Sequence, residues 1–126
     1  LKEKIYKSGL LNSDLISLLN IHIENKNKYL YADSAEPDKI REILNSGFNV
    51  YPADKSVNDG IDLVQRKKLF IHCDSANLIK ELKSYSWKTD KTGRILDEPV
   101  KSNDHILDAL RYGLYRKENE MKIRFV

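Results

Sequence analysis

The stretch KYLYADSAEP, residues 28–37, decides the fold that this sequence predicts. Residues 29–32, YLYA, are rich in β-formers and predict a short buried strand. Pro37 suits the first turn of a helix. Asp33 therefore stands at the carboxyl end of a strand and just before a helix, and open α/β sheets bind ligands at that edge. The simpler alternative is that Asp33 or Ser34 only caps the helix.

Helix and strand patterns alternate along the rest of the chain. Helical spacing marks 13–25, 37–46, 58–68 and 75–85, and strand composition marks 48–51 and 69–73. The turn sequence DKTG at 90–93, between Trp87 and Ile95, predicts a β-hairpin. This order predicts one α/β domain with a mostly parallel central sheet, helices on both faces and an additional hairpin.

A second informative stretch is SNDHILDALRYGLY, residues 102–115, which predicts a helix. Its apolar stripe consists of Ile106, Leu110 and Leu114. His105 and Asp108 fall on another line, one turn apart, so an imidazole and a carboxylate emerge side by side. The alternative is a surface histidine and an Asp108 that pairs with Arg111 or Tyr112.

The composition of the 126 residues is that of a soluble globular domain, with 40% hydrophobic and 33% charged residues. No run approaches the length of a membrane helix and no signal peptide opens the chain, which indicates a cytoplasmic protein without a membrane partner. Cys73 has no second cysteine to pair with and is expected to be a buried, reduced thiol in the strand at 69–73. His72 has no acidic partner evident in the sequence and is predicted to be structural.

The net charge of +3, from 22 basic and 19 acidic residues, does not by itself indicate nucleic-acid binding. Basic residues gather at 66–68 and again, diluted by acidic ones, at 80–101. A phosphate-contacting surface and an ordinary solvated face both fit this pattern.

Five segments together resemble the C-terminal nuclease domain of the large terminase subunit of tailed bacteriophages and prophages. They are ADSAEP (32–37), IREILNSGFNVYPADK (40–55), GIDLVQ (60–65), ELKSYSWKTDKTG (81–93) and NDHILDALRYGLY (103–115). The resemblance covers roughly residues 6–115 and keeps the order of the family.

The resemblance implies an RNase H-like domain that cuts double-stranded DNA with divalent metal held by acidic residues. Asp33 matches the second acidic ligand of the family, Asp108 the last one, and His105 the histidine three residues before it. Two Mg²⁺ or Mn²⁺ ions about 4 Å apart activate water and stabilise the leaving oxygen in such a site, and both prefer carboxylate oxygens. His105 is expected to support this chemistry by orienting water or phosphate, or by carrying a proton.

Lys55 stands where the family has a lysine that could reach phosphate, and Lys88, Lys91 and Arg94 are further candidates for DNA contacts. In the full-length protein the implied partners are an N-terminal ATPase domain, the small terminase subunit and the portal, in the cytoplasm of a bacterial host. The chain contains no GxxxxGK[ST] motif, so the ATPase motor lies outside it.

One element of the family pattern has no counterpart here. The first catalytic aspartate of the family lies on an opening strand, upstream of anything that resembles residues 1–6. Residues 1–126 are therefore expected to be a single nuclease domain, incomplete at its N-terminus and almost inactive alone. The alternative is a catalytically inactive RNase H-like module that binds DNA or a partner protein, as a fragment or a prophage remnant.

Overall fold

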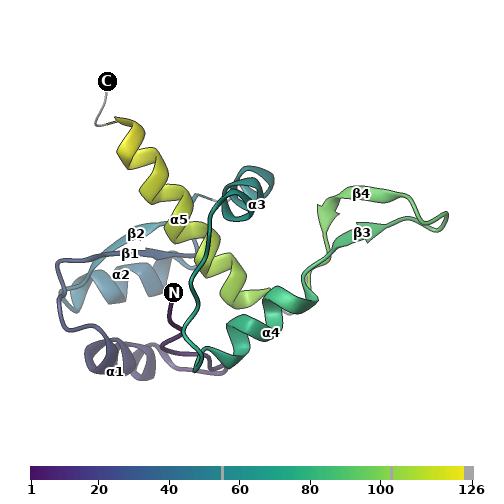
Figure 1. The fold of residues 1–126 in the computed structure, drawn as a ribbon. Coiled ribbons are helices and arrows are strands. Elements are labelled where there is room, and N and C mark those ends of the chain that lie inside the picture. Colours follow the sequence, from purple (N-terminus) through teal and green to yellow (C-terminus); the bar gives the residue numbers. More distant parts are fainter. Residues whose placement is uncertain (55, 103, 124–126) are drawn as a thin grey trace.

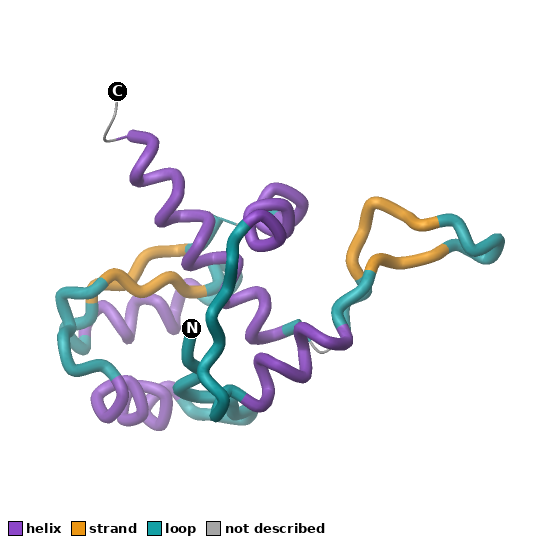
Figure 2. Tube along the Cα trace, in the orientation of Figure 1, coloured by secondary structure: helices purple, strands orange, loops and turns teal. Residues whose placement is uncertain are grey.

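The computed structural model describes residues 1–54, 56–102 and 104–123, which contain five helices and four strands (Figures 1 and 2). The helices are α1 (Asn12–His22), α2 (Pro37–Asn45), α3 (Val57–Arg66), α4 (Ala76–Ser84) and α5 (His105–Ile123). The strands are β1 (Tyr29–Ala32), β2 (Asn49–Pro52), β3 (Trp87–Thr89) and β4 (Ile95–Pro99). None of these helices is long and apolar enough to cross a bilayer.

The strands β1 and β2 form a parallel pair, with α2 as the connection between them. Leu30 is opposite Val50, and Ala32 is opposite Pro52. Just past the strands, the backbone N–H of Ala53 donates to the carbonyl of Ala32 at 2.8 Å. Because parallel strands end at the same edge, the residues that follow β1 and β2 emerge beside each other.

The core lies on one face of this pair. Phe48 has an exposed fraction of 2%, and it packs with Ile43 of α2 and Val50 of β2. Partly buried side chains complete this core: Leu15, Leu19, Ile23, Leu30, Ala32 and Ile40. Full burial of a side chain the size of Phe48 stabilises a fold by about 1.5–3 kcal/mol. The alternate residues, Tyr29 and Tyr51, meet edge to face on the opposite, exposed face.

Two glycines provide the turns that this arrangement needs. Gly47, with φ +90°, follows α2 and turns the chain into β2, as expected for a residue after a helix. Gly93, with φ +84°, lies in the turn between β3 and β4. Both backbone conformations are in the left-handed region, which favours glycine.

The long helix α5 is the centre of the second half of the molecule. The helices α3 and α4 and the strand β1 all pack against it. Gly60 allows α3 to approach α5 closely, since a Cβ there would lie 3.3 Å from Cδ of Arg111. The hairpin of β3 and β4 projects away from the rest of the molecule (Figure 1).

The predicted strand at 69–73 is absent, and this prediction was wrong. The segment is an extended loop in which Phe70 is 73% exposed and Cys73, predicted to be buried, is also exposed. Its backbone pairs with the start of the chain, where Leu1 N donates to Phe70 O at 2.6 Å and His72 N donates to Leu1 O at 2.8 Å. At its end, His72 O accepts the N–H of Ser75 at 3.0 Å in the turn before α4. Apolar, β-branched composition predicts a strand only when a neighbouring strand completes the ladder.

Candidate functional site

Asp33 lies where the sequence predicts it, directly after β1 and before α2, and its side chain is exposed. Its Oδ1 accepts a hydrogen bond from the N–H of Ala35 at 2.9 Å, and its carbonyl accepts one from Glu36 at 3.1 Å. The carboxylate therefore stabilises the turn into α2. The N-cap of α2 is Glu36, without a side-chain cap hydrogen bond, so the alternative in which Asp33 or Ser34 caps the helix was wrong.

Asp108 lies in the first turn of α5, and its Oδ1 pairs with Nη2 of Arg111. This pairing confirms the alternative expected for Asp108. The two side chains differ in burial, because 35% of Asp108 is exposed but only 9% of Arg111. Arg111 Nε and Nη1 are buried without a hydrogen-bond partner among the described residues. The guanidinium thus depends on Asp108 for its compensating charge.

A cavity of about 220 Å³ adjoins Arg111. Apolar side chains of α3, α4 and α5 line most of it, together with Tyr85. Burial raises the pKa of the Tyr85 hydroxyl, and the nearby charge of Arg111 opposes this shift. The volume of the cavity has room for ordered water, and its polar side chains offer hydrogen-bond partners.

His105 is the first residue of α5, and it is exposed. It lines an open groove of about 900 Å³, which Ile5, Tyr6 and Ala109 also line. Asp108 instead contacts Arg111. The helix places the two residues one turn apart as predicted, with His105 facing the N-terminal segment.

The packing of β1 against α5 brings together the elements that carry Asp33 and Asp108 (Figure 1). These elements are far apart in the sequence, and no local pattern predicts their contact. The ends of β1 and β2 and one side of α5 therefore share one region of the molecule.

Asp54 is an acidic residue at this edge that the sequence reasoning missed. It follows β2 as Asp33 follows β1, and its Oδ1 accepts hydrogen bonds from N and Oγ of Ser56 at 2.9 and 2.8 Å. These hydrogen bonds, with a smaller contribution from the charge of Arg116, hold its pKa below the ordinary value. The rule that parallel strands end at one edge could have identified it.

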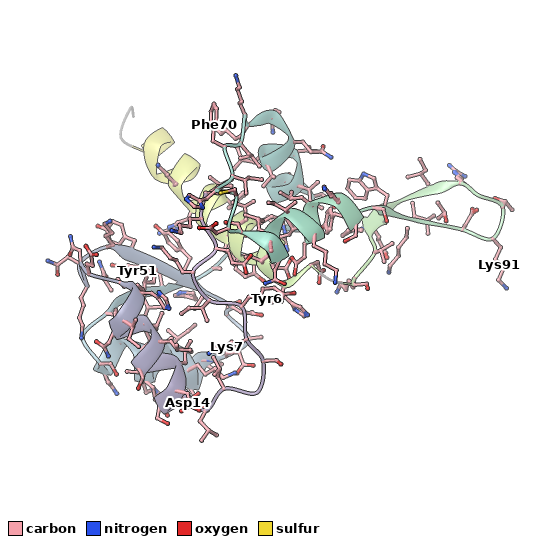
Figure 3. The ribbon with its side chains drawn as sticks, turned by 60° about the horizontal axis from the view of Figure 1, so that its bottom comes forward. Tyr6, Lys7, Asp14, Tyr51, Phe70 and Lys91 are labelled. Atoms are coloured by element: carbon pink, nitrogen blue, oxygen red, sulfur yellow. The ribbon has the colours of Figure 1, made fainter. Side chains whose placement is uncertain are left out.

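The predicted DNA contacts lie mainly on the hairpin. Lys88 on β3 forms an ion pair with Glu98 on β4, with Nζ and Oε2 2.9 Å apart. Lys91 is exposed at the tip of the hairpin (Figure 3). Arg94 is exposed just before β4. Lys55 lies outside the described residues. Exposed cations on a projecting hairpin suit contact with phosphates.

The base of the hairpin and the start of α3 line a groove of about 630 Å³. Its charged residues are mixed in sign: Asp59, Lys88, Glu98 and Lys101. This balance gives the groove little net attraction for a polyanion, in contrast to the hairpin tip.

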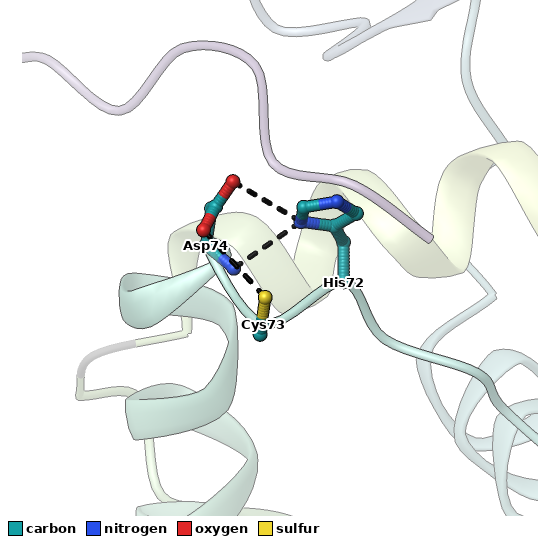
Figure 4. A group of neighbouring side chains, drawn as sticks. All are labelled: His72, Cys73 and Asp74. Carbon is teal, nitrogen blue, oxygen red and sulfur yellow. Dashed lines mark hydrogen bonds and ion pairs between the residues drawn. The ribbon is translucent and has the colours of Figure 1, made fainter.

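His72, Cys73 and Asp74 form a small surface cluster (Figure 4). The prediction that His72 has no acidic partner was wrong, because its Nδ1 lies 3.4 Å from Oδ2 of Asp74. Cys73 Sγ lies 3.6 Å from Oδ1 of Asp74. Imidazole, thiol and carboxylate are ligands that suit zinc better than magnesium.

The geometry of this cluster nevertheless does not favour the binding of a metal ion. All three side chains are exposed, they come from consecutive residues, and His72 Nδ1 already accepts the N–H of Asp74 at 3.2 Å. An ion would have to break that hydrogen bond and would remain open to water. The cluster is therefore a weaker candidate than the edge that Asp33 and Asp54 share.

Comparison with known proteins identifies the family. The family described as "Terminase RNAseH like domain" matches residues 1–115. The "PBSX phage terminase large subunit" of Bacillus subtilis (strain 168) is 30% identical over 113 residues, which cover 86% of this chain and 26% of that protein. The "Terminase, large subunit" of Escherichia phage T5 is 35% identical over 71 residues, which cover 51% of this chain and 16% of that protein. The chain thus spans about a quarter of the length of these relatives, or less.

Solved structures agree with this match. The g2p (large terminase) nuclease domain from bacteriophage SPP1, solved with bound Mn, superposes with a TM-score of 0.76 at 20% identity, covering 86% of this chain and 65% of that one. The large terminase from a thermophilic bacteriophage superposes with a TM-score of 0.67 at 30% identity, covering 81% of this chain and 26% of that one. The predicted RNase H-like fold is confirmed, and the chain belongs to the family of terminase RNase H-like domains.

Proposed function

We propose that this chain is a metal-dependent endonuclease domain of a phage DNA-packaging terminase and that it hydrolyses double-stranded, concatemeric viral DNA. The observation that carries the proposal is that β1, which ends just before Asp33, packs against α5, which bears Asp108. Membership of the terminase RNase H-like family supports it.

The proposed metal ligands are Asp33 and Asp108, with Mg²⁺ or Mn²⁺ as the ion. Carboxylate oxygens are the donors that these hard cations prefer, and the exposed Asp33 fits this requirement. The Mn bound to the SPP1 nuclease domain supports a divalent ion. When bound, such an ion lowers the pKa of a coordinated water and stabilises charge on phosphate oxygens.

The protein residues around the ion have separate tasks. Arg111 pairs through Nη2 with Oδ1 of Asp108, and this contact orients the carboxylate. His105 stands one turn away and can orient a phosphate or take up a proton. Lys55, Lys88, Lys91 and Arg94 are proposed to contact DNA phosphates on either side of the cut.

The proposed partners follow from the same assignment. They are double-stranded DNA and, in the full-length protein, an N-terminal ATPase domain, the small terminase subunit and the portal. The relatives named as large subunits support an association with packaging. The proposed location is the cytoplasm of the bacterial host.

A second candidate is an RNase H-like module that binds DNA or a partner protein without cutting. The ion pair between Asp108 and Arg111 favours it, because a carboxylate engaged by a buried cation is a weaker metal ligand. Salt-dependent DNA binding without metal-dependent cleavage is the result that this candidate requires.

The first prediction tests the metal ligands by NMR, since Mn²⁺ broadens the signals of nuclei close to it. We expect weak binding, because two carboxylates supply only part of the roughly six oxygen ligands of such an ion. The amide signals of Asp33 and Asp108 should broaden first, and Asp33→Asn should abolish this effect. Any manganese-dependent cleavage of plasmid DNA should disappear in the same variant and fall only in part in His105→Ala.

Asp38→Asn is the matched control, since Asp38 is an exposed aspartate of α2 that pairs with Arg41. It removes the same charge and should leave the broadening unchanged. Broadening that centres on residues 72–74, or that survives Asp33→Asn, would refute the proposed site.

A further inference from the structure

Glu81 is a buried acidic residue that the proposed metal site does not use. It lies on α4 and is only 2% exposed. Its Oε2 accepts the backbone N–H groups of Ile106 at 2.9 Å and Leu107 at 3.1 Å, and its Oε1 accepts the hydroxyl of Tyr6 at 2.7 Å. Glu81 thus joins the N-terminal segment, α4 and the start of α5.

The hydrogen bonds to α5 act at a particular point of the helix. The first N–H groups of a helix have no partner within it and form the positive end of its dipole. A carboxyl oxygen that accepts two of them stabilises the helix start in one position. Ile106 and Leu107 lie between His105 and Asp108, so the same contacts fix the backbone that carries both.

The helix α4 is itself anchored on the N-terminal segment. Glu3 Oε2 accepts the N–H of Leu78 at 2.9 Å, and its Oε1 accepts Nδ2 of Asn77 at 2.7 Å. In return the fully buried Ser75 accepts the N–H of Glu3 through Oγ at 2.9 Å. Glu81 therefore cannot move relative to the N-terminal segment without loss of several hydrogen bonds.

We infer that Glu81 is the positioning residue for His105 and Asp108, because it holds the first turn of α5 in the orientation that presents these two side chains. The inference rests on the proposed function, which gives the two side chains their roles. Glu81 itself is not proposed as a ligand, since three donors already occupy its buried oxygens.

Two substitutions separate positioning from general stabilisation, and they make the second prediction. Glu81→Gln keeps an oxygen for the two N–H groups, and its amide can donate to the oxygen of Tyr6. Glu81→Leu removes every acceptor and leaves the two N–H groups unsatisfied. The matched control is Ser75→Ala, which removes a buried hydrogen bond at the start of α4 that does not involve α5.

The measurements are Mn²⁺ broadening at Asp108, hydrogen exchange of the Ile106 and Leu107 amides, and the thermal unfolding temperature. In Glu81→Leu we expect Mn²⁺ affinity to fall by about tenfold or more, the usual effect of losing a group that orients a ligand. Exchange at Ile106 and Leu107 should accelerate in parallel. In Glu81→Gln, both the Mn²⁺ affinity and the exchange at Ile106 and Leu107 should return to the values of the unsubstituted protein. Ser75→Ala should lower the unfolding temperature without changing the Mn²⁺ affinity or the exchange.

Equal losses of Mn²⁺ affinity in Glu81→Leu and Ser75→Ala would overturn the inference. The loss of affinity would then be a result of lower folding stability and not of a misplaced α5. Unchanged exchange at Ile106 and Leu107 in Glu81→Leu would also overturn it. If the unsubstituted protein shows no Mn²⁺ broadening at Asp33 or Asp108, the proposed metal site fails. The exchange data then decide separately whether Glu81 holds the start of α5.

Discussion

The acidic residues of the candidate site each have a partner that is close in the sequence. Asp33 accepts the N–H of Ala35, Asp54 accepts two groups of Ser56, and Asp108 pairs with Arg111. Such contacts orient a carboxylate before any ion arrives and lower the conformational entropy lost on binding. They also compete with the ion for lone pairs, so each partner influences affinity.

The pair of Asp108 and Arg111 supports a third prediction, about asymmetric stability. Removal of Asp108 leaves a buried guanidinium without its compensating charge, and breaking a buried pair in this way costs about 3–5 kcal/mol. Removal of Arg111 leaves a carboxylate that is 35% exposed and can reach water. It also removes two buried nitrogens that lack partners among the described residues. We therefore expect Asp108→Ala to destabilise the protein clearly more than Arg111→Met.

Urea unfolding of both variants measures this difference, and Asp108→Asn is the control because its amide oxygen still accepts from Arg111. Equal destabilisation by the two truncations would contradict the prediction. The result also matters for nuclease assays, where Asp108→Asn removes the charge of a ligand with less damage to the fold than Asp108→Ala.

At the scale of single elements, the turn of the hairpin depends on one side chain. Asp90 Oδ1 accepts hydrogen bonds from N and Oγ1 of Thr92 and from N of Arg94, at 2.8, 2.6 and 2.9 Å. These bonds, led by that from the Thr92 hydroxyl, lower the pKa of Asp90. The hairpin tip is thus held by an ionised carboxylate.

The fourth prediction follows from the sign of that shift. The pKa of Asp90 is lower in the folded hairpin than in the unfolded chain, where it is about 3.9. Its stabilising contribution is therefore complete above the unfolded pKa and is lost as the pH falls through the folded one. NMR shifts of Thr92 and Arg94 amides should report this loss of the turn in acid. Asp90→Asn keeps an oxygen acceptor but has no carboxyl group to protonate. The Thr92 and Arg94 amide shifts of this variant should therefore not change over the acid range in which Asp90 titrates.

Most elements could be predicted from local patterns, and the failures have physical causes. Pro37 and Gly47 bracket α2 as expected, and the DKTG sequence forms the predicted turn. The segment 69–73 has the composition of a strand, but its long-range backbone pairing is with Leu1, and none of the described strands forms a ladder with it. The pairing of His72 with Asp74 was missed because it depends on the turn that follows the expected strand.

At the scale of the whole molecule, the candidate site combines residues that no local pattern connects. Local patterns indicate Asp33 and Asp108 separately, but only the resemblance to one family joins them in one predicted site. Glu81 begins the segment 81–93 that resembles the family, but no pattern in the sequence gives it a role at the site. Its role depends on contacts among the N-terminal segment, α4 and the start of α5, and sequence periodicity does not predict such long-range contacts.

The fifth prediction concerns the distribution of charge over the molecule. The net charge is only +3, so DNA binding must depend on local groups of cations. If Lys91 and Arg94 contact phosphates, their double substitution by alanine should weaken DNA binding and reduce the salt dependence by about two ion contacts. Fluorescence anisotropy over a range of salt concentrations measures both quantities.

The control is the double substitution of Lys39 and Arg41 by alanine, since both lie on α2 and pair with neighbouring acidic residues. It removes the same charge from another face and should leave the salt dependence nearly unchanged. Equal effects of the two double variants would show that only overall charge matters and would remove the hairpin from the proposed DNA surface.

The anchoring of α4 on the first residues of the chain also bears on the order of folding. The contacts of Leu1 with Phe70, Glu3 with Leu78 and Tyr6 with Glu81 span 69 to 75 residues. During synthesis, the first residues must wait until α4 has left the ribosome. The unit of β1, α2 and β2 closes over a much shorter loop and can form first. The start of α5 is fixed only after these longer loops have closed, so the backbone around Asp33 can form before the backbone around Asp108 is held in place.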